Sequence, residues 1–127
     1  MEDLYNWRPK DLALYVPPDA VLFVVIILLV ISNTFMTMAW YNHLQSPNRT
    51  FFMSLAVAMF FVVFEYSFNI HANALGYTKY DLYTLKIIQE AITLCVFIAY
   101  AYFTYNESVD MKRLAAIGLV FAATTLV

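Results

Sequence analysis

The sequence predicts an all-α membrane protein, namely a four-transmembrane-helix bundle with short loops and an N-terminal interfacial segment. Three observations predict this fold class. Of the 127 residues, 63% are hydrophobic and only 13% are charged, and the mean hydropathy is +0.69, which exceeds what a water-soluble core of this size can bury. The charges leave long gaps between them. Tyrosine and tryptophan gather near the ends of these gaps, as they do at membrane interfaces.

The gaps between the charges define four predicted membrane spans. Charged residues are absent from residues 20–48, 50–64, 91–106 and 114–127. About 20 mostly apolar residues cross a bilayer core of roughly 30 Å. We therefore expect spans at residues 20–41, 51–72, 83–105 and 111–127, which together form a transmembrane domain over residues 20–127. Because the loops are short, neighbouring spans are expected to run antiparallel.

The ends of the first and fourth spans carry specific expectations. Pro17 and Pro18 cannot continue a helix backwards, so the first span is expected to begin after them, with Asp19 as its N-cap. The fourth span is only just long enough to cross. It is expected to lie in thin membrane, to pack against protein or to continue past residue 127.

Residues 1–19 form a predicted extramembrane segment at the surface of the bilayer. The segment begins with Glu2 and Asp3 instead of a basic region, and no cleavage site follows, so it is not a signal peptide. Its apolar residues alternate with charges, which suits a membrane surface or a protein partner. Tyr5, Trp7 and Tyr15 are the candidate docking residues. An unstructured tail is the open alternative.

The charges predict little about orientation and exclude one class of partner. Lysine and arginine number four on the N-terminal side of the predicted spans and three on the other side, which is almost no bias under the positive-inside rule. Fixed orientation through partner contacts and dual insertion of antiparallel copies both remain open. The formal net charge of −2 leaves no basic surface for nucleic acid. The expected partners are the lipid bilayer and either a second copy or a larger membrane complex.

Polar residues inside the predicted spans are the first candidates for function. Glu65 lies in the second half of the second span, where an ionisable side chain costs about 2.5–3.5 kcal/mol. Desolvation favours the neutral form of a carboxyl, so proton exchange is a candidate role. Asn69 lies on the same helical face. On the third span, a polar stripe at positions i, i+3, i+4 and i+7 comprises Lys86, Gln89, Glu90 and Thr93.

These residues share one half of the bilayer, because the second span ends and the third begins at the same loop. The predicted intramembrane cluster is Glu65, Asn69, Lys86, Gln89 and Glu90. Two interpretations stay open. In the first, Lys86 neutralises Glu90 or Glu65 and the cluster locks two helices together. In the second, a carboxyl faces a cavity and exchanges a proton or a cationic solute. Both expect Glu65 to point into the bundle.

The other polar positions carry weaker signals. Asn33, Thr37 and Trp40 lie on one face of the first span and are candidates to line a cavity. Small hydroxyl residues there are more often close-packing positions between helices. His43 and His71 stand alone at the ends of spans, and Cys95 is the only cysteine. The residues show no catalytic triad, metal-ligand spacing or phosphate loop, so we expect no enzyme activity, metal or cofactor.

Four ordered motifs resemble those of a known family. They are SNTFMTMAWYNHL at 32–44, FEY at 64–66, ANALGY at 72–77 and LKIIQEAITL at 85–94. Together they resemble a group of small four-helix membrane proteins of uncharacterised function within the drug/metabolite transporter (DMT) superfamily. The end of the chain, from residue 105 to residue 118, is similar to the closing helix pair of that superfamily. The resemblance implies a four-helix membrane fold and, by analogy, dimeric proton-coupled export.

The chain departs from the superfamily pattern in two ways. The small multidrug exporters of the superfamily use a glutamate in their first helix, and residues 20–41 contain none, so that role does not transfer to Glu65 or Glu90. The segment before Asp19 is also atypical. Two alternative functions are therefore considered, in order of preference. The first is a DMT-like, proton-coupled transporter of small cations or metabolites, and the second is a non-transporting accessory subunit of a larger membrane complex.

Overall fold

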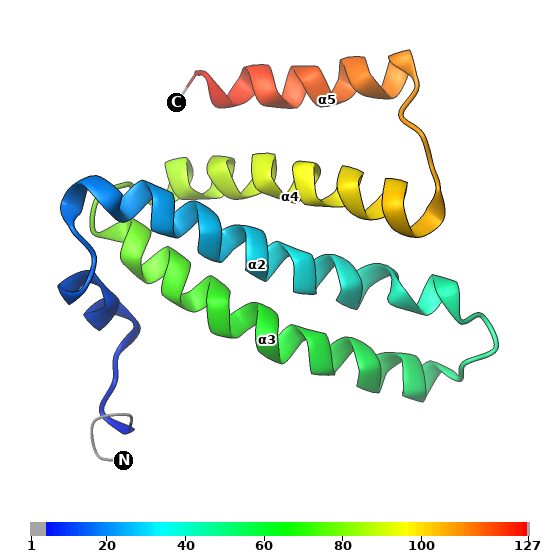
Figure 1. Cartoon of the computed structure of the whole chain (residues 1–127), viewed down its shortest axis with the longest axis horizontal. Helices are drawn as coiled ribbons and strands as arrows, with labels where there is room; N and C mark the ends of the chain where they lie inside the picture. Colours follow the sequence, from blue (N-terminus) through cyan, green and yellow to red (C-terminus); the bar gives the residue numbers. More distant parts are fainter. Residues whose placement is uncertain (1–4, 127) are drawn as a thin grey trace.

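A computed structural model describes residues 5–126 as a set of long helices. Figure 1 shows that the four longest lie side by side and that consecutive ones run in opposite directions. Two short 3₁₀ helices precede them. In chain order the elements are η1 (Pro9–Leu14), η2 (Pro18–Ala20), α2 (Val21–Tyr41), η3 (Asn42–Gln45), α3 (Phe51–Tyr77), α4 (Leu82–Tyr105) and α5 (Met111–Thr124).

Among residues 5–126, three helices are long and apolar enough to cross a membrane. They cover Pro18–Gln45, Phe51–Tyr77 and Leu82–Tyr105, which correspond to the first three predicted spans. α3 continues five residues past residue 72, where we expected the second span to end. α5 has 14 residues and is therefore about 21 Å long, shorter than the roughly 30 Å of a bilayer core. Residue 127 lies outside the described residues.

Side-chain caps begin the three later helices. Thr50 accepts from the backbone N–H of Met53 at 3.2 Å. Asp81 accepts from the N–H of Thr84 at 2.8 Å, and Asp110 does the same for Arg113 at 2.8 Å. The side chain and then the backbone N–H of Thr84 stabilise the charged form of Asp81 and so lower its pKa.

The predicted N-cap of the first span is wrong. Asp19 lies inside η2, and the residue that precedes α2 is Ala20, whose side chain makes no capping hydrogen bond. Pro18 explains the difference, because its fixed φ angle suits the first position of a helical turn. It begins a 3₁₀ turn that leads directly into α2, so Asp19 is already helical.

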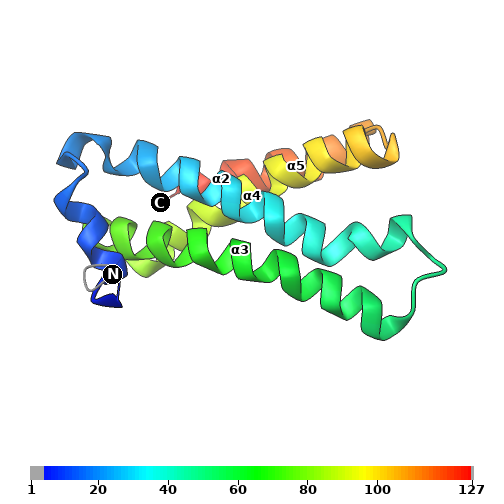
Figure 2. The same cartoon turned by 60° about the horizontal axis from the view of Figure 1, so that its bottom comes forward.

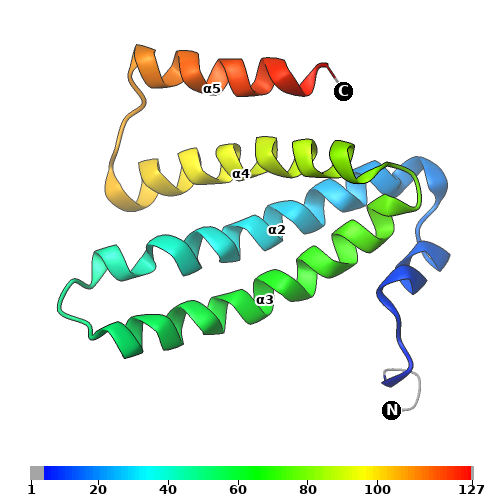
Figure 3. The same ribbon diagram turned by 180° about the vertical axis from the view of Figure 1, so that it is seen from behind.

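The helices pack in a fixed order. α2 lies between α3 and α4, and α5 is outermost beside α4 (Figures 1 and 3). A view turned by 60° shows the N-terminal segment against the end of α3 (Figure 2). The buried apolar core lies at this end of the bundle, and Leu12, Ala13 and Val16 of the segment pack against it. The core consists of Val21, Val25, Leu29, Ala72, Leu75 and Leu85.

Outside this core the large apolar side chains face outward. Phe52 and Phe60 on α3 and Phe103 on α4 are all exposed in the isolated chain. Such surfaces are normal for helices whose solvent is hydrocarbon, and the backbone hydrogen bonds of the helices satisfy the polar groups that lipid cannot. The exposed faces are therefore the faces that meet lipid or another membrane helix.

Gly76 permits a close contact between helices in the core. A Cβ at this position would lie 2.5 Å from Cδ2 of Leu85 and 3.5 Å from Cγ2 of Val25. Both neighbours are buried, so neither side chain has free space to move into. Gly76 thus lets α3, α4 and α2 meet in the core.

We predict that Gly76→Ala destabilises the fold by about 1–3 kcal/mol, because an added methyl overpacks the core. The matched control is Gly118→Ala on α5, where an added Cβ meets nothing within 4 Å. That change should be neutral or slightly stabilising, since alanine is the better helix former. Thermal unfolding in detergent measures both. Equal midpoints for the two variants would contradict the close contact at Gly76.

Candidate functional site

Glu65 is a buried carboxyl between α2 and α3. Its exposed fraction is 4%, so it points into the bundle, as both interpretations of the sequence expect. Ser32 Oγ of α2 donates a hydrogen bond to Glu65 Oε1 at 3.2 Å. The second oxygen, Oε2, is buried and has no hydrogen-bond partner among the described residues. One oxygen of this carboxyl therefore accepts a hydrogen bond from Ser32, and the other accepts none from the described residues.

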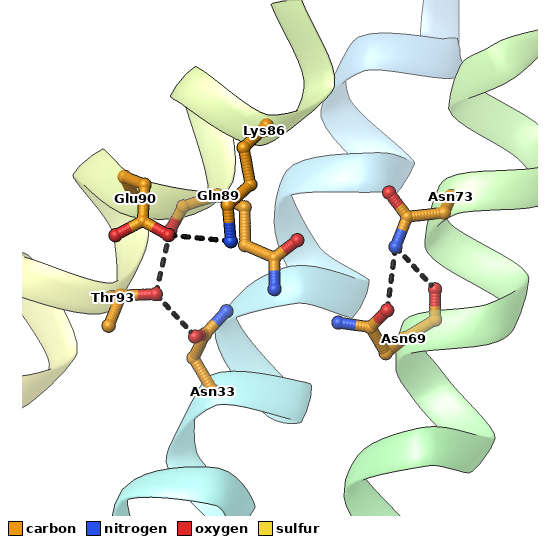
Figure 4. Close-up of polar contacts among 7 residues, drawn as sticks. All are labelled: Asn33, Asn69, Asn73, Lys86, Gln89, Glu90 and Thr93. Atoms are coloured by element: carbon orange, nitrogen blue, oxygen red, sulfur yellow. Dashed lines mark hydrogen bonds and ion pairs between the residues drawn. The ribbon is translucent and has the colours of Figure 1, made fainter. Parts of the chain in front are cut away.

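A series of hydrogen bonds starts at the C-terminal half of α3, passes through Ser32 of α2 and returns to the Glu65 carboxyl on α3. Asn73 Nδ2 donates to Asn69 Oδ1 at 2.6 Å, and Asn69 Nδ2 lies 3.4 Å from Ser32 Oγ, which in turn donates to Glu65. Every donor in the chain is directed toward Glu65. Figure 4 shows the Asn69–Asn73 pair on α3, away from the polar residues of α4. This series of hydrogen bonds ends at Glu65 Oε1, whereas Oε2 accepts none from the described residues.

The polar residues of α4 form a separate group. Lys86 Nζ and Glu90 Oε1 make an intrahelical ion pair at 2.9 Å, and both side chains are exposed. The backbone carbonyl of Gln89 lies 2.8 Å from Thr93 Oγ1, which shares its single hydroxyl hydrogen between this carbonyl and Asn33 of α2. Among the described residues, no ion pair joins Lys86 to Glu65. The structure brings Glu65 together with Asn69, and Lys86 together with Glu90, as two groups on different helices.

Asn33 connects α2 to α4. Thr93 Oγ1 donates to Asn33 Oδ1 at 2.6 Å, and Asn33 Nδ2 donates to the carbonyl of Leu29 at 2.7 Å. Thr37 donates to the carbonyl of Asn33 at 2.7 Å. Asn33 and Thr37 are buried between helices, whereas Trp40 is exposed. Of the three candidate cavity residues, two lie in a helix interface and one faces outward.

An apolar groove of about 620 Å³ lies on the other side of α2, and none of the candidate residues from the sequence lines it. Thr34 is its polar contribution from α2. Apart from the amphipathic ring of Tyr100, the remaining walls come from apolar or small side chains of α2, α4 and α5, namely Ile26, Val30, Ala91, Ile92, Cys95, Val96, Ala99, Phe103 and Phe121. Its volume is in the usual range for small-molecule sites. An apolar residue that lines a groove looks the same in sequence as one that faces lipid.

The N-terminal segment is attached to its own bundle through Trp7. Trp7 Nε1 donates to His71 Nε2 at 2.9 Å, and the indole stacks on Tyr15 with ring centroids 6.1 Å apart. Tyr5 and Tyr15 are 91% and 74% exposed. Of the three candidate docking residues, Trp7 is engaged within the chain and the two tyrosines face outward. The sequence marked His71 as isolated, because its partner lies 64 positions away.

We predict that Thr93→Val destabilises the bundle by about 1 kcal/mol, because it removes the hydrogen bond between α4 and α2 and leaves Asn33 Oδ1 unpaired. Thr34→Val is the matched control, since the Thr34 hydroxyl bonds only to the carbonyl of Val30 on its own helix. Thermal unfolding of both variants in the same detergent is the measurement. A control that loses as much stability as Thr93→Val would remove the interhelical bond as the cause.

Comparison with known proteins identifies the family. A family model described as "Putative member of DMT superfamily (DUF486)" matches residues 25–127. No curated protein and no solved structure matches the chain. The matched stretch contains all of α3, α4 and α5 and most of α2, and the N-terminal segment lies outside it. Since the match covers well over half of the residues, the chain belongs to this DMT-superfamily family of multi-pass integral membrane proteins.

Proposed function

We propose that the chain is a proton-coupled transporter of small cations or metabolites in which Glu65 carries the proton. Membership of the DMT superfamily makes it a transporter-like membrane protein. Coupling to protons and the class of substrate go beyond the family match. The proposal for both rests on the arrangement of polar groups around α2 and on the chemistry of a carboxyl inside the membrane.

The observation that carries this proposal is that only one oxygen of the Glu65 carboxyl accepts a hydrogen bond from the described residues. A carboxyl in a span costs about 2.5–3.5 kcal/mol unless its environment compensates. A purely structural carboxyl is expected to have both oxygens satisfied, because a buried unpaired acceptor is unfavourable. Ser32 satisfies only Oε1 of Glu65. The free Oε2 is the atom that can carry a proton, because Oε1 already accepts the hydrogen bond from Ser32.

The position of the groove supports a coupling role for α2. Ser32, which holds Glu65, and Thr34, which lines the groove, are two residues apart on this helix. Residues two apart point in nearly opposite directions on an α-helix. A shift of α2 therefore changes both environments together. In this conformation Glu65 is closed off from outside, so proton exchange requires α2 and α3 to separate. We propose that transport is driven by alternation between this closed state and a state in which α2 and α3 are apart.

The accessory-subunit function is the second candidate, and the N-terminal segment supports it. Tyr5 and Tyr15 are exposed on a segment that Trp7 fixes to the bundle. Exposed tyrosines on a fixed segment are typical of protein interfaces, because tyrosine contributes large contact area at low entropic cost. In this proposal the segment holds the bundle in a larger membrane complex.

The transport proposal predicts that Glu65→Gln abolishes coupled flux while the fold is retained, because the amide keeps the shape and cannot exchange a proton. The measurement uses proteoliposomes that contain a pH-sensitive dye. Tetramethylammonium, choline and guanidinium are each added outside. At least one should change the internal pH with the wild-type chain, and with Glu65→Gln the response should fall to that of protein-free liposomes.

Glu90→Gln is the matched control for this experiment. Glu90 is also a glutamate of a spanning helix, but it is exposed and paired with Lys86. Its flux should stay near that of the wild type. Unchanged flux in Glu65→Gln would remove Glu65 from the mechanism. A wild-type chain that responds to none of the three cations would contradict a cation substrate.

The accessory proposal predicts that the double change Tyr5→Ser and Tyr15→Ser releases the chain from its complex. Deleting the whole segment is a poorer test, because Leu12, Ala13 and Val16 pack on the core. The measurement is purification in mild detergent at native abundance, with identification of co-purifying subunits. Foreign subunits in stoichiometric amount that are lost in the double variant support this function. Purification of the wild type without any foreign subunit contradicts it.

A further inference from the structure

The contact between Trp7 and His71 fixes the protonation state of the histidine. Trp7 Nε1 lies 2.9 Å from His71 Nε2, and His71 Nδ1 lies 2.7 Å from the carbonyl oxygen of Ser67. An indole N–H can only donate, and a carbonyl oxygen can only accept. Both contacts are satisfied by one form of the ring, the neutral tautomer with its hydrogen on Nδ1. His71 thus donates to Ser67 and accepts from Trp7.

Protonation of this ring removes one contact and keeps the other. An imidazolium carries hydrogen on both nitrogens, so both become donors. The bond from Nδ1 to Ser67 is unchanged. Nε2 can no longer accept, and two N–H groups then face each other at the contact with Trp7. The contact that breaks is the one that joins the N-terminal segment to α3.

We propose that His71 is a pH-sensitive latch, which holds the N-terminal segment on α3 when neutral and releases Trp7 when protonated. Histidine is the side chain whose charge ordinarily changes between about pH 5 and about pH 8. The neutral ring therefore closes the latch, and uptake of a proton opens it. It does not depend on whether the chain transports a solute.

Among the described residues, no carboxylate forms an ion pair with His71 in the closed state. The ion pairs among residues 5–126 are Lys86–Glu90 and Asp110–Arg113, so no described carboxylate lies within 4.0 Å of the imidazole. Asp11 is occupied with the backbone N–H of Arg8 at 2.9 Å, and Asp81 caps α4. The other titratable groups are Tyr5, Arg8, Lys10, Tyr15 and Asp19 on the segment, Glu65, Tyr66 and Tyr77 on α3, and Lys79 and Tyr80 on the turn before α4.

The remaining contacts of the segment limit what the latch moves. Leu12, Ala13 and Val16 pack on the apolar core, and Lys79 Nζ donates to the carbonyl of Pro18 at 3.3 Å. None of these contacts involves His71. Loss of the bond to His71 therefore loosens residues 5–8, where Trp7 keeps its stacking on Tyr15, while η1 and η2 stay against the core. The movement uncovers the face of α3 around His71, six residues along the helix from Glu65.

The test follows Trp7 in the full chain in lipid nanodiscs. The sequence has two tryptophans, so Trp40→Phe leaves Trp7 as the single fluorescent reporter. Acrylamide quenching is measured from about pH 8 to about pH 5. We expect quenching to rise as the pH falls, because loss of one hydrogen bond lowers the ratio of docked to released Trp7 by about three- to tenfold.

Two further variants separate the latch from other titrations. In His71→Gln the side-chain amide oxygen can still accept from Trp7 and does not titrate, so quenching should be independent of pH. His43→Gln removes the second of the two histidines, which is exposed at the other end of α2, and should keep the wild-type rise. A flat wild-type curve, or an unchanged rise in His71→Gln, overturns the latch.

A measurement without a substitution at His71 guards against misfolding of that variant. Nitrogen NMR of the chain with ¹⁵N-labelled histidine distinguishes the two neutral tautomers directly. We expect His71 to carry its hydrogen on Nδ1 at high pH and to gain the second hydrogen as Trp7 becomes accessible. A neutral ring with its hydrogen on Nε2 overturns the proposal, because that form cannot accept from Trp7.

Discussion

Hydrocarbon cannot solvate a polar group, and this constraint decides where each polar side chain of the bundle lies. Helices satisfy the backbone within themselves. The remaining polar side chains either pair across a helix interface or pair on an exposed face. Ser32 with Glu65 and Asn33 with Thr93 follow the first course, and both contacts are buried or half-buried. Lys86 with Glu90 follows the second, near the start of α4. The small apolar core at the N-terminal end then fixes how closely the helices approach.

α2 is the organising helix of the molecule, because three consecutive residues connect it to three surroundings. Ser32 bonds to Glu65 on α3, Asn33 bonds to Thr93 on α4, and Thr34 faces the groove that α4 and α5 complete. Successive residues of an α-helix point about 100° apart, so a run of three polar residues serves three directions. The family match begins at residue 25 and includes this run. A rotation or tilt of α2 thus acts on a carboxyl, on an interface and on a groove at once.

The spans were predictable from sequence, and the partners of the polar residues were not. Long stretches without charge indicated where α2, α3 and α4 lie, since a charged side chain in hydrocarbon is costly whatever the fold. Spacing showed that Lys86 and Glu90 share a face, but spacing on one helix does not tell which neighbour that face meets. Packing placed Glu65 beside Ser32 of α2 and kept it apart from Lys86. The groove and the Trp7–His71 contact each bring together residues far apart in the chain, which spacing along one helix cannot reveal. Asp19 does not cap α2, because a 3₁₀ turn begins before it.

The short α5 has a consequence for the bilayer itself. This helix runs beside α4, which has 24 residues to its 14. Among the described residues α5 is the shorter wall of the groove, so part of α4 extends beyond it on that flank. In a bilayer the uncovered part of α4 needs lipid or another protein against it. If α5 itself crosses the bilayer, the lipid beside it has to thin to match its length.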